Sequence, residues 1–253
     1  MDKKNLLTDV TLERYIRHVH LPHMGSEGQQ RLKAGSVVVV GLGGLGCVSA
    51  LYLTLAGVGR IGLVEDDRVN LHNLHRQILY TNDDLGVDKL SLAAYRLEQH
   101  NPEVEFKTYP QRLTQDNALD IIRDFDLVID GTDNLETRHV INRTCATLDK
   151  VYIFGAVNLF DGQLSVFHAS QGPCLACVFP QMPHVEKINH QERLAVLNTL
   201  PGVVGALQAA EAIKLITKLG KPLIGKLLIF NALNSTFEQV EIQKNPVCQV
   251  CGQ

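Results

Sequence analysis

The stretch VVVVGLGGLGC, residues 37–47, is the feature that most limits what this 253-residue chain can fold into. Four consecutive valines are typical of a strand buried on both faces of a sheet, and Gly41, Gly43 and Gly46 follow them. Glycines in this pattern allow a tight strand-to-helix turn whose backbone N–H groups reach a phosphate at the positive end of a helix dipole. The stretch therefore predicts a phosphate-bearing ligand, with a dinucleotide as the default and tight packing without a ligand as the alternative.

Strand and helix patterns alternate along the chain that follows. Strands are expected at residues 36–41, 60–65, 103–110, 126–130 and 151–157, and helices at 45–57, 89–100, 115–124 and 134–149. Beyond residue 155, strands at 162–170, 226–232 and 237–243 and an amphipathic helix at 203–219 indicate a more mixed sheet. This order predicts the α/β class: a Rossmann-like, doubly wound and mainly parallel sheet that continues into a mixed or antiparallel, substrate-facing half.

No flexible linker interrupts the chain, so we expect one domain over residues 1–253. Its expected parts are an N-terminal helical arm at 1–34, a nucleotide-binding half at 35–155 and a second half at 156–253. The net charge of −3 argues against nucleic acid as a partner. Without a secretion signal or 18 consecutive uncharged apolar residues, we expect a cytoplasmic protein that does not bind a membrane.

Three charged residues after the glycine stretch argue against a dinucleotide. Arg76 and Lys89 follow the acidic strand end at 65–67, and Asp133 follows a later strand. Hydride transfer does not need them, whereas attack on the α-phosphate of ATP needs cations for the growing charge and a carboxylate for Mg²⁺. Each has an ordinary alternative: Arg76 in a surface ion pair, Lys89 as a solvated helix residue, Asp133 as a helix N-cap. Their joint order along the chain favours an ATP site.

Six cysteines divide into two kinds. Cys47 and Cys145 stand alone in apolar surroundings, and Cys47 is expected to be a buried helix residue without a chemical role. Two C-x-x-C pairs can complete a tetrahedral Cys₄ zinc site, which is closed and therefore structural. The alternative is a pair of redox motifs. The expected zinc ligands are Cys174, Cys177, Cys248 and Cys251.

Several motifs together resemble the ThiF/MoeB/HesA family, prokaryotic relatives of ubiquitin-activating enzymes. They are RYIRHVHLPHMGSEGQQRLKAGSVVVVGLGGLG, NLHRQIL, DLVIDGTDN, the two C-x-x-C pairs and GALQAAEAIKLI, within residues 11–252. The resemblance implies an adenylyltransferase that uses Mg·ATP to adenylate the C-terminal glycine of a ubiquitin-fold sulfur carrier ending in Gly-Gly, with release of pyrophosphate. It also implies a homodimer in which an N-terminal arginine reaches the neighbour's ATP site.

The resemblance also implies roles for individual residues. Matching positions place Gly41, Gly43 and Gly46 against the nucleotide, Glu65 at the ribose, Asp67, Asn73, Arg76 and Lys89 around the triphosphate, Asp133 on Mg²⁺, and Arg14 with Arg17 across the dimer. Glu65 is a departure, since relatives often carry Asp there. The carrier's carboxylate is already a nucleophile, so alignment and charge neutralisation suffice and no general base is needed.

One feature common in relatives is missing, a cysteine before the GALQA-like helix. Residues 178–205 contain none, so we expect either that adenylation is the whole reaction and a separate sulfurtransferase delivers sulfur, or that a partner supplies the thiol. His184 and His190 in this segment are expected to be solvated loop residues. Molybdopterin and thiamine synthesis both stay open as the pathway, with a slight preference for the first. The rival hypotheses are another conjugation reaction, an NAD(P)-dependent oxidoreductase and an inactive dimeric scaffold.

Overall fold

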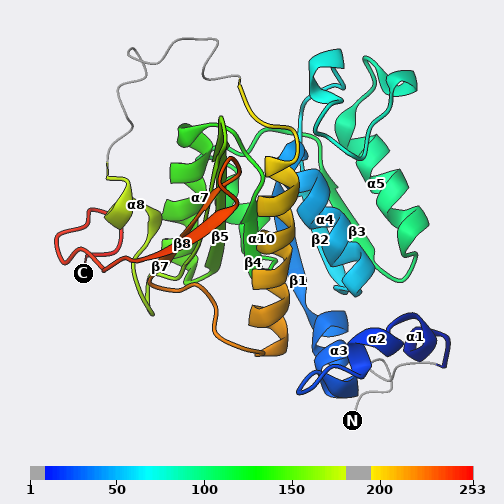
Figure 1. Ribbon diagram of the computed structural model, residues 1–253, viewed down its shortest axis with the longest axis horizontal. Helices are drawn as coiled ribbons and strands as arrows, with labels where there is room; N and C mark the ends of the chain where they lie inside the picture. The colour runs from blue at the N-terminus through cyan, green and yellow to red at the C-terminus, as the bar shows by residue number, and fades with distance from the viewer. Residues whose placement is uncertain (1–8, 181–194, 253) are drawn as a thin grey trace.

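The computed structural model describes residues 9–180 and 195–252. Three short helices form the N-terminal arm and lie at the amino-terminal end of the first strand (Figure 1). They are α1 (Asp9–Arg14), α2 (Ile16–Val19) and α3 (Gly25–Ala34). Leu32 of α3 is fully buried, and the side chain of Gln29 donates to the carbonyl of Ala56 at 2.8 Å, which fixes the arm to the next helix.

Strands and helices then alternate through the first half of the chain, as the sequence predicts. The elements are β1 (Ser36–Val40), α4 (Gly44–Ala56), β2 (Arg60–Val64), the 3₁₀ turns η2 (Leu71–Asn73) and η3 (Asn82–Asp84), α5 (Lys89–His100), β3 (Glu105–Tyr109), α6 (Ala118–Ile122), β4 (Leu127–Asp130), α7 (Leu135–Leu148) and β5 (Val151–Asn158). Helix α4 ends because Gly57 adopts a left-handed conformation with φ of 78°, which costs glycine little.

The second half adds three antiparallel strands to the same sheet. They are β6 (Asp161–Phe167), β7 (Lys226–Asn231) and β8 (Thr236–Glu241), with helices α8 (Leu175–Val178) and α10 (Leu200–Thr217) between them. The eight strands lie in the order β3-β2-β1-β4-β5-β6-β7-β8, parallel as far as β5 and antiparallel beyond it. This confirms the predicted fold class. The division expected at residues 155 and 156 falls inside β5, and the sheet is continuous there.

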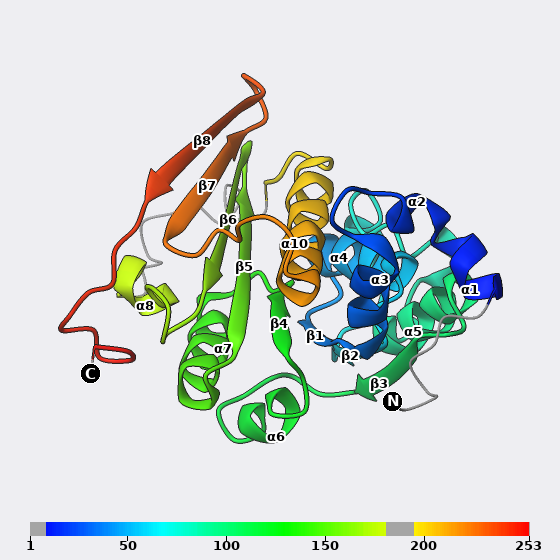
Figure 2. The same ribbon diagram turned by 90° about the horizontal axis from the view of Figure 1, so that it is seen from below.

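Helices cover both faces of the parallel part of the sheet, with α6 and α7 on one face and α3, α4, α5 and α10 on the other (Figure 2). The valines of β1 explain the arrangement. Val37 and Val39 pack into the core under α4 and α10, while Val38 and Val40 pack into the core under α6 and α7. All four are at most 2 % exposed. A strand buried on both faces reads as a continuous apolar run.

Two helices differ in extent from their predicted ranges. Helix α10 covers 200–217 instead of 203–219: Pro201 is tolerated in its first turn, and Lys218 ends it in a left-handed conformation. The helix expected at 115–124 is shorter, covering 118–122. In the preceding loop, Asn117 accepts a hydrogen bond from the N–H of Thr114 and so holds a turn before the helix begins.

One helix in the described part of the chain, α10, is long and apolar enough to cross a membrane, with a mean hydropathy of 1.2. Half of it is buried inside this protein, where it packs on α4 and on β5 and β6. Its buried polar side chains are hydrogen-bonded: Gln208 donates to the carbonyl of Asp130 at 2.7 Å, and Glu211 accepts from the N–H of Leu223 at 3.0 Å. These are the contacts of a core helix.

Candidate active site

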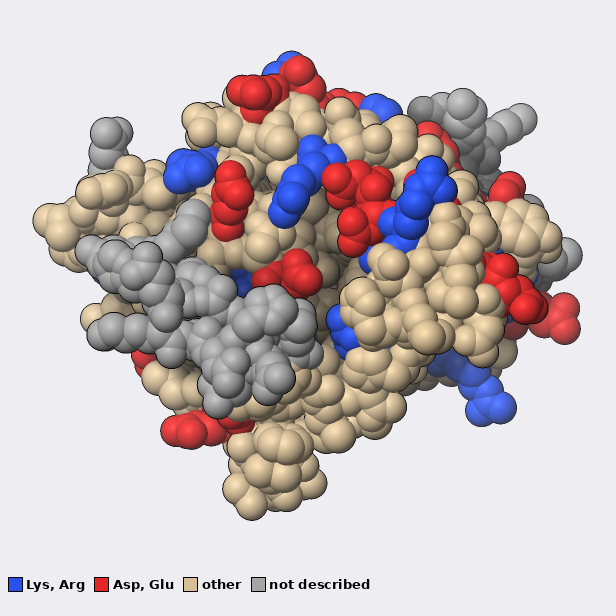
Figure 3. Space-filling model, turned by 90° about the horizontal axis from the view of Figure 1, so that it is seen from above, with Lys and Arg blue, Asp and Glu red and all other residues tan. Residues whose placement is uncertain are grey.

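A cleft of about 820 Å³ opens at the carboxyl ends of the parallel strands. The residues that follow β1, β2 and β4 line it, together with the polar residues between positions 70 and 77, Lys89 and the start of α7. Figure 3 shows this face, on which acidic and basic side chains surround a hollow. Ligands of open α/β sheets bind at this edge, where the strand order reverses direction between β1 and β4.

The glycine turn forms the floor of the cleft. Gly41 has φ of 85°, a left-handed conformation that favours glycine, and both Gly41 and Gly43 line the cleft. Gly46 is not among the lining residues. A Cβ at Gly46 would lie 1.8 Å from the carbonyl oxygen of Gly41, so this glycine allows α4 to pack against its own turn. The three glycines therefore differ in role: two face the cleft and the third permits close packing.

Glu65, at the end of β2, holds the glycine turn in place. Its side chain accepts hydrogen bonds from the N–H of Leu42 at 2.8 Å and from the N–H groups of Asp66 and Asp67 at 2.9 and 3.0 Å. Glu65 is 9 % exposed and lines the cleft. Carboxylate oxygens accept more than one hydrogen bond each, so these contacts leave capacity for a ribose hydroxyl.

Two of the predicted cations lie at the cleft in different settings. The side chain of Lys89 is only 4 % exposed and its Nζ lies 3.2 Å from the carboxylate of Asp67, which excludes the solvated alternative. Arg76 Nη1 donates to the carbonyl of His72 at 2.9 Å and contacts His75 Nε2 at 2.7 Å. Both observed acceptors of Arg76 are neutral, and Arg76 forms no ion pair within the described residues. No carboxylate among them therefore offsets its positive charge at the cleft.

His75 must accept from Arg76, because a guanidinium has no acceptor, and only a neutral imidazole can do so. Burial, followed by the charge of Arg76 and the neighbouring His72, lowers the pKa of His75. The neutral form that the hydrogen bond requires is therefore the favoured one. Asn73, the other residue expected here, is buried and lines the cleft.

Asp133 lies at the cleft after β4, with an exposed side chain. It makes no hydrogen bond or ion pair with the part of the chain that the structure describes. The N-cap alternative is excluded, because Asn134 caps α7 by accepting from the N–H of Thr137 at 2.9 Å. A free carboxylate at the cleft is a suitable ligand for Mg²⁺, which prefers oxygen donors.

A buried network beneath Asp133 was not anticipated from the sequence. Asp130 is fully buried, and its carboxylate accepts from the hydroxyl groups of Tyr152 and Thr132, each at 2.6 Å, and from the N–H of Thr132 at 2.9 Å. Arg138 Nε lies 3.3 Å from the same carboxylate. Burial, then the charge of Asp130, raises the pKa of Tyr152 well above its usual value, so its hydroxyl stays protonated and donates. A carboxylate that ends an apolar strand, as in DLVID, was the available signal.

Arg14 and Arg17 lie away from the cleft of their own chain. Both are exposed in the N-terminal arm, and Arg14 Nη1 donates to the carbonyl of His100 at 3.0 Å. The arm lies at the opposite end of the strands from the cleft (Figure 1). His184 and His190 fall outside the described residues.

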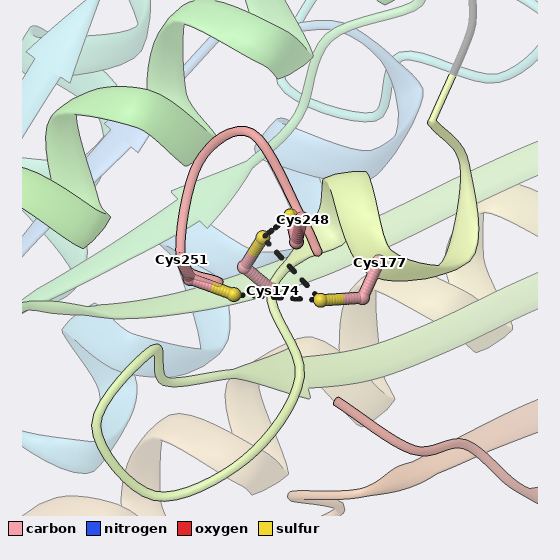
Figure 4. Close-up of side chains that lie close together, drawn as sticks. All are labelled: Cys174, Cys177, Cys248 and Cys251. Carbon is pink, nitrogen blue, oxygen red and sulfur yellow. Dashed lines mark hydrogen bonds between the residues drawn. The ribbon is translucent and has the colours of Figure 1, made fainter. Parts of the chain in front are cut away.

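The four cysteines of the C-x-x-C pairs come together from α8 and the C-terminal segment (Figure 4). Their Sγ atoms all lie within 4.8 Å of one another, with separations of 3.9 Å for Cys174–Cys177, 3.7 Å for Cys174–Cys248 and 3.4 Å for Cys177–Cys251. Tetrahedral zinc with Zn–S bonds of about 2.3 Å requires sulfur separations of about 3.8 Å. The spacing fits a Cys₄ metal site and is too wide for disulfides.

A metal takes cysteine as the thiolate, and the thiols of this cluster differ in how readily they ionise: burial raises the pKa of Cys174 and Cys251, whereas that of Cys248 is lowered. Burial raises the pKa of Cys248, but hydrogen bonds from the backbone N–H groups of Cys251 and Val250 and from the thiols of Cys174 and Cys177 together lower it to about 7. The two isolated cysteines are different. Cys47 is buried as predicted and Cys145 is buried too, and burial raises the pKa of both, to about 12 for Cys47. Such thiols are unreactive.

Comparison with known proteins gives a consistent result. The chain is 48% identical over 250 residues to the "Sulfur carrier protein adenylyltransferase" of Thermus thermophilus, covering 97% of this chain and 92% of the relative. It is 41% identical to the "Adenylyltransferase and sulfurtransferase MOCS3" of Anopheles gambiae, over 99% of this chain but 58% of the relative. The chain thus spans less than two thirds of the length of the MOCS3 relatives, 52% in the case of Zea mays MOCS3-1.

Solved structures agree. Crystal structures of E. coli MccB with MccA-N7isoASN and with ATP superpose with TM-scores of 0.84 and 0.82, each at 25% identity. They cover 96% and 94% of this chain and 75% and 74% of the MccB chain. The model of the ThiF family matches residues 15–250. The resemblance seen in the motifs is therefore confirmed, and the chain belongs to the ThiF family.

Proposed function

We propose that this protein adenylates the C-terminal glycine of a ubiquitin-fold sulfur carrier, using ATP and releasing pyrophosphate. The observation that carries the proposal is the cleft, which gathers the glycine turn, Arg76, Lys89 and Asp133 in one place. The chain that forms this cleft is itself 48% identical to a sulfur carrier protein adenylyltransferase, over nearly the whole length of both proteins. An NAD(P)-dependent oxidoreductase is not favoured, since the Thermus thermophilus relative and the MOCS3 relatives are all named adenylyltransferases.

The reaction forms one bond and breaks one. A carboxylate oxygen of the carrier attacks the α-phosphorus, an acyl-adenylate forms, and the bond to the β-phosphate breaks as pyrophosphate leaves. The carboxylate needs no general base. The protein's contribution is to align the two reactants and to neutralise charge on the phosphate oxygens and on the departing pyrophosphate.

Individual residues suit these tasks. Backbone N–H groups of the glycine turn and the amino end of α4 would receive phosphate oxygens. Arg76 and Lys89 would stabilise the developing charge, and Asn73 and Asp67 would help to line this part of the site. Glu65 would bind the ribose. Gly46 would act indirectly, by keeping the turn close to α4.

Mg²⁺ would bind at Asp133, which lines the cleft and whose carboxylate has no partner among residues 9–180 and 195–252. When bound, this ion supplies positive charge against the phosphate oxygens. The cysteine quartet would hold a structural zinc ion, since four thiolates leave no open position for chemistry. That zinc would tie the C-terminal segment to α8.

A homodimer would complete the site. Arg14 and Arg17 are exposed at the end of the molecule away from their own cleft, so they can serve only the cleft of another subunit. Exposed apolar side chains on neighbouring elements support an interface. They are Ile16, Leu21, Tyr52, Leu55 and Tyr95, each between 41% and 62% exposed.

The carrier's identity would decide the pathway. A carrier of molybdopterin synthesis or of thiamine synthesis fits the same chemistry, and a separate sulfurtransferase would replace the activated oxygen with sulfur. The cytoplasm, where carriers and ATP are available, is the proposed location. Attachment of the activated carboxylate to a peptide or amine is the alternative outcome.

ATP/pyrophosphate exchange tests the proposal. Wild type is incubated with labelled pyrophosphate, ATP, Mg²⁺ and a panel of purified ubiquitin-fold carriers ending in Gly-Gly, and label in ATP is measured. We expect exchange that depends on one carrier and falls at least about a hundredfold in Asp133→Ala, since a lost metal ligand costs several kcal/mol at the transition state.

Two controls sharpen the result. A carrier lacking its last two glycines must give no exchange, and Asp120→Ala, which removes an exposed acid outside the cleft, must behave as wild type. Exchange that survives Asp133→Ala would remove the metal assignment. Absence of exchange with every carrier would overturn the substrate class.

A further inference from the structure

Arg138 is a cleft residue with no assigned role, and its guanidinium is held on three sides. The side chain is 11 % exposed. Nη2 donates to the carbonyls of Thr132 and Gly155 at 2.8 and 3.2 Å, Nε lies 3.3 Å from the carboxylate of Asp130, and the group lies 5.3 Å from the ring centroid of Phe154. A long, flexible side chain is thereby fixed in one orientation before any ligand binds.

Asp130 is the anchor of this arrangement. It is fully buried at the end of β4, and Tyr152 and Thr132 supply hydrogen bonds that satisfy its carboxylate independently of Arg138. A buried carboxylate with several partners has a fixed position, so it orients the arginine beside it. Asp130 is therefore a positioning residue, because it reaches the cleft only through Arg138 and the loop that carries Asp133.

One nitrogen of Arg138 is left for a ligand. Nη2 is occupied by two carbonyls, and Nε is buried 3.3 Å from the Asp130 carboxylate without a hydrogen bond, whereas Nη1 has no partner within the described chain. Arg138 lines the cleft, and its side chain is still 11 % exposed. An oriented guanidinium N–H pair is a donor suited to an anionic oxygen.

The position of Arg138 along the sheet edge indicates which anion it meets. In the order β2, β1, β4, β5, the cleft presents Glu65, then the glycine turn, then Asp133, and last Val157 of β5. Arg76 lies over the glycine turn, since its Cγ would be 3.5 Å from a Cβ at Gly44. The phosphate site thus has its own cation. Arg138 lies on the other side of Asp133, where β5 leads into the antiparallel half.

We infer that Arg138 binds the C-terminal carboxylate of the carrier and directs one of its oxygens at the α-phosphate, with Asp130, itself fixed by Tyr152, holding the guanidinium in place. This inference rests on the proposed function and names the residue that recognises the group to be activated. Once the carboxylate becomes an acyl-adenylate its charge is lost, so Arg138 binds the substrate more strongly than the product.

A thermodynamic cycle tests the inference. The carrier that supports exchange is made in two forms, ending in a carboxylate or in a carboxamide, and the Kd of each for wild type and for Arg138→Gln is measured by calorimetry. For wild type we expect amidation to weaken binding about tenfold to a hundredfold, the value of a hydrogen bond to a charged group. For Arg138→Gln we expect little further loss on amidation, because the interaction is already absent.

Steady-state kinetics add a second readout. Arg138→Gln should raise the KM for carrier and leave the KM for ATP within about twofold, and Arg143→Gln, an exposed arginine on the same helix outside the cleft, should change neither. A rise in the KM for ATP instead would place Arg138 in the phosphate site. Equal losses on amidation for wild type and Arg138→Gln would overturn the inference directly.

The variant leaves Asp130 without its cationic partner, so its fold needs a check by thermal unfolding. If Arg138→Gln does not fold, the double variant Asp130→Asn/Arg138→Gln removes the buried charge and keeps hydrogen-bonding partners for Tyr152 and Thr132, and the same cycle applies to it. Failure of the proposed function is distinguishable. In that case wild type itself gives no exchange with any carrier, whereas failure of the inference alone leaves wild-type exchange intact.

Discussion

Replacing Gly46 with alanine tests whether the glycine turn depends on close packing as well as on backbone conformation. Gly46 lies in the first turn of α4, and a Cβ added there would be 1.8 Å from the carbonyl oxygen of Gly41 and 2.9 Å from its carbonyl carbon. Both are backbone atoms of the cleft floor, so no side chain can rotate away to relieve the contact. The turn or the helix must move by more than about 1 Å.

The expected magnitude follows from two opposing effects. Overpacking costs about 1–3 kcal/mol, and a contact with backbone belongs at the upper end of that range. Alanine recovers about 0.5–1 kcal/mol through its better helix propensity. We therefore expect Gly46→Ala to lower the free energy of unfolding by about 2 kcal/mol and the Tm by about 4–8 °C. A displacement of this size should also lower exchange activity about a hundredfold.

Gly202→Ala is the matched control. Gly202 also lies in the first turn of a helix, α10, but a Cβ there would have nothing within 4 Å. This variant should be as stable as wild type or slightly more so. Thermal unfolding by circular dichroism and the exchange assay are run on both. If Gly46→Ala unfolds within about 1 °C of wild type and retains its KM for ATP, the packing explanation is wrong.

Two further predictions concern the zinc cluster and the loop after η3. We expect about one zinc ion per chain by metal analysis. Cys248→Ser should lose this ion and lower the free energy of unfolding by about 2–4 kcal/mol, because the site closes a long loop of chain. Wild-type protein that contains no zinc and unfolds like the variant would contradict this. Asp84 accepts hydrogen bonds from the N–H and hydroxyl of Thr81 at 2.6 and 2.9 Å and forms an ion pair with Arg96 at 2.8 Å. Burial raises the pKa of Asp84, but these contacts outweigh burial and lower the pKa overall. A depressed folded-state pKa stabilises the fold above the unfolded value of about 3.9 and ceases to do so as pH falls through the folded value. Asp84→Asn should therefore cost about 1–2 kcal/mol at pH 7 and much less at pH 3 in urea unfolding, and an equal cost at both values would refute this account.

The fold could be predicted from the sequence because its signals are local. Four valines before a glycine turn require a strand buried on both faces, and Gly57 and Lys89 mark the end of α4 and the start of α5 as predicted. The ends of α10 and α6 were less well placed, since proline in a first turn and an asparagine turn are compatible with several start points. Boundaries depend on capping contacts that a periodic pattern does not contain.

The candidate site divides in the same way. Residues with a distinctive type at a fixed offset, such as Arg76 and the cysteine pairs, could be named in advance. Asp130 and Arg138 could not, because the sequence does not show that one is fully buried and that the other is oriented by it. The buried state of Lys89 was likewise not visible in the sequence.

The sequence by itself determined the class of fold, the position of the glycine turn and the family, since each depends on contacts between near neighbours or on residue types in order. Tertiary structure decided which glycines face the cleft, which carboxylates are hydrogen-bonded by other described residues, and how Arg138 is held. The physical reason is that these properties depend on burial and on partners from distant strands: Tyr152 meets Asp130 only because β5 pairs with β4, and Glu65 reaches Leu42 only because β2 lies beside β1.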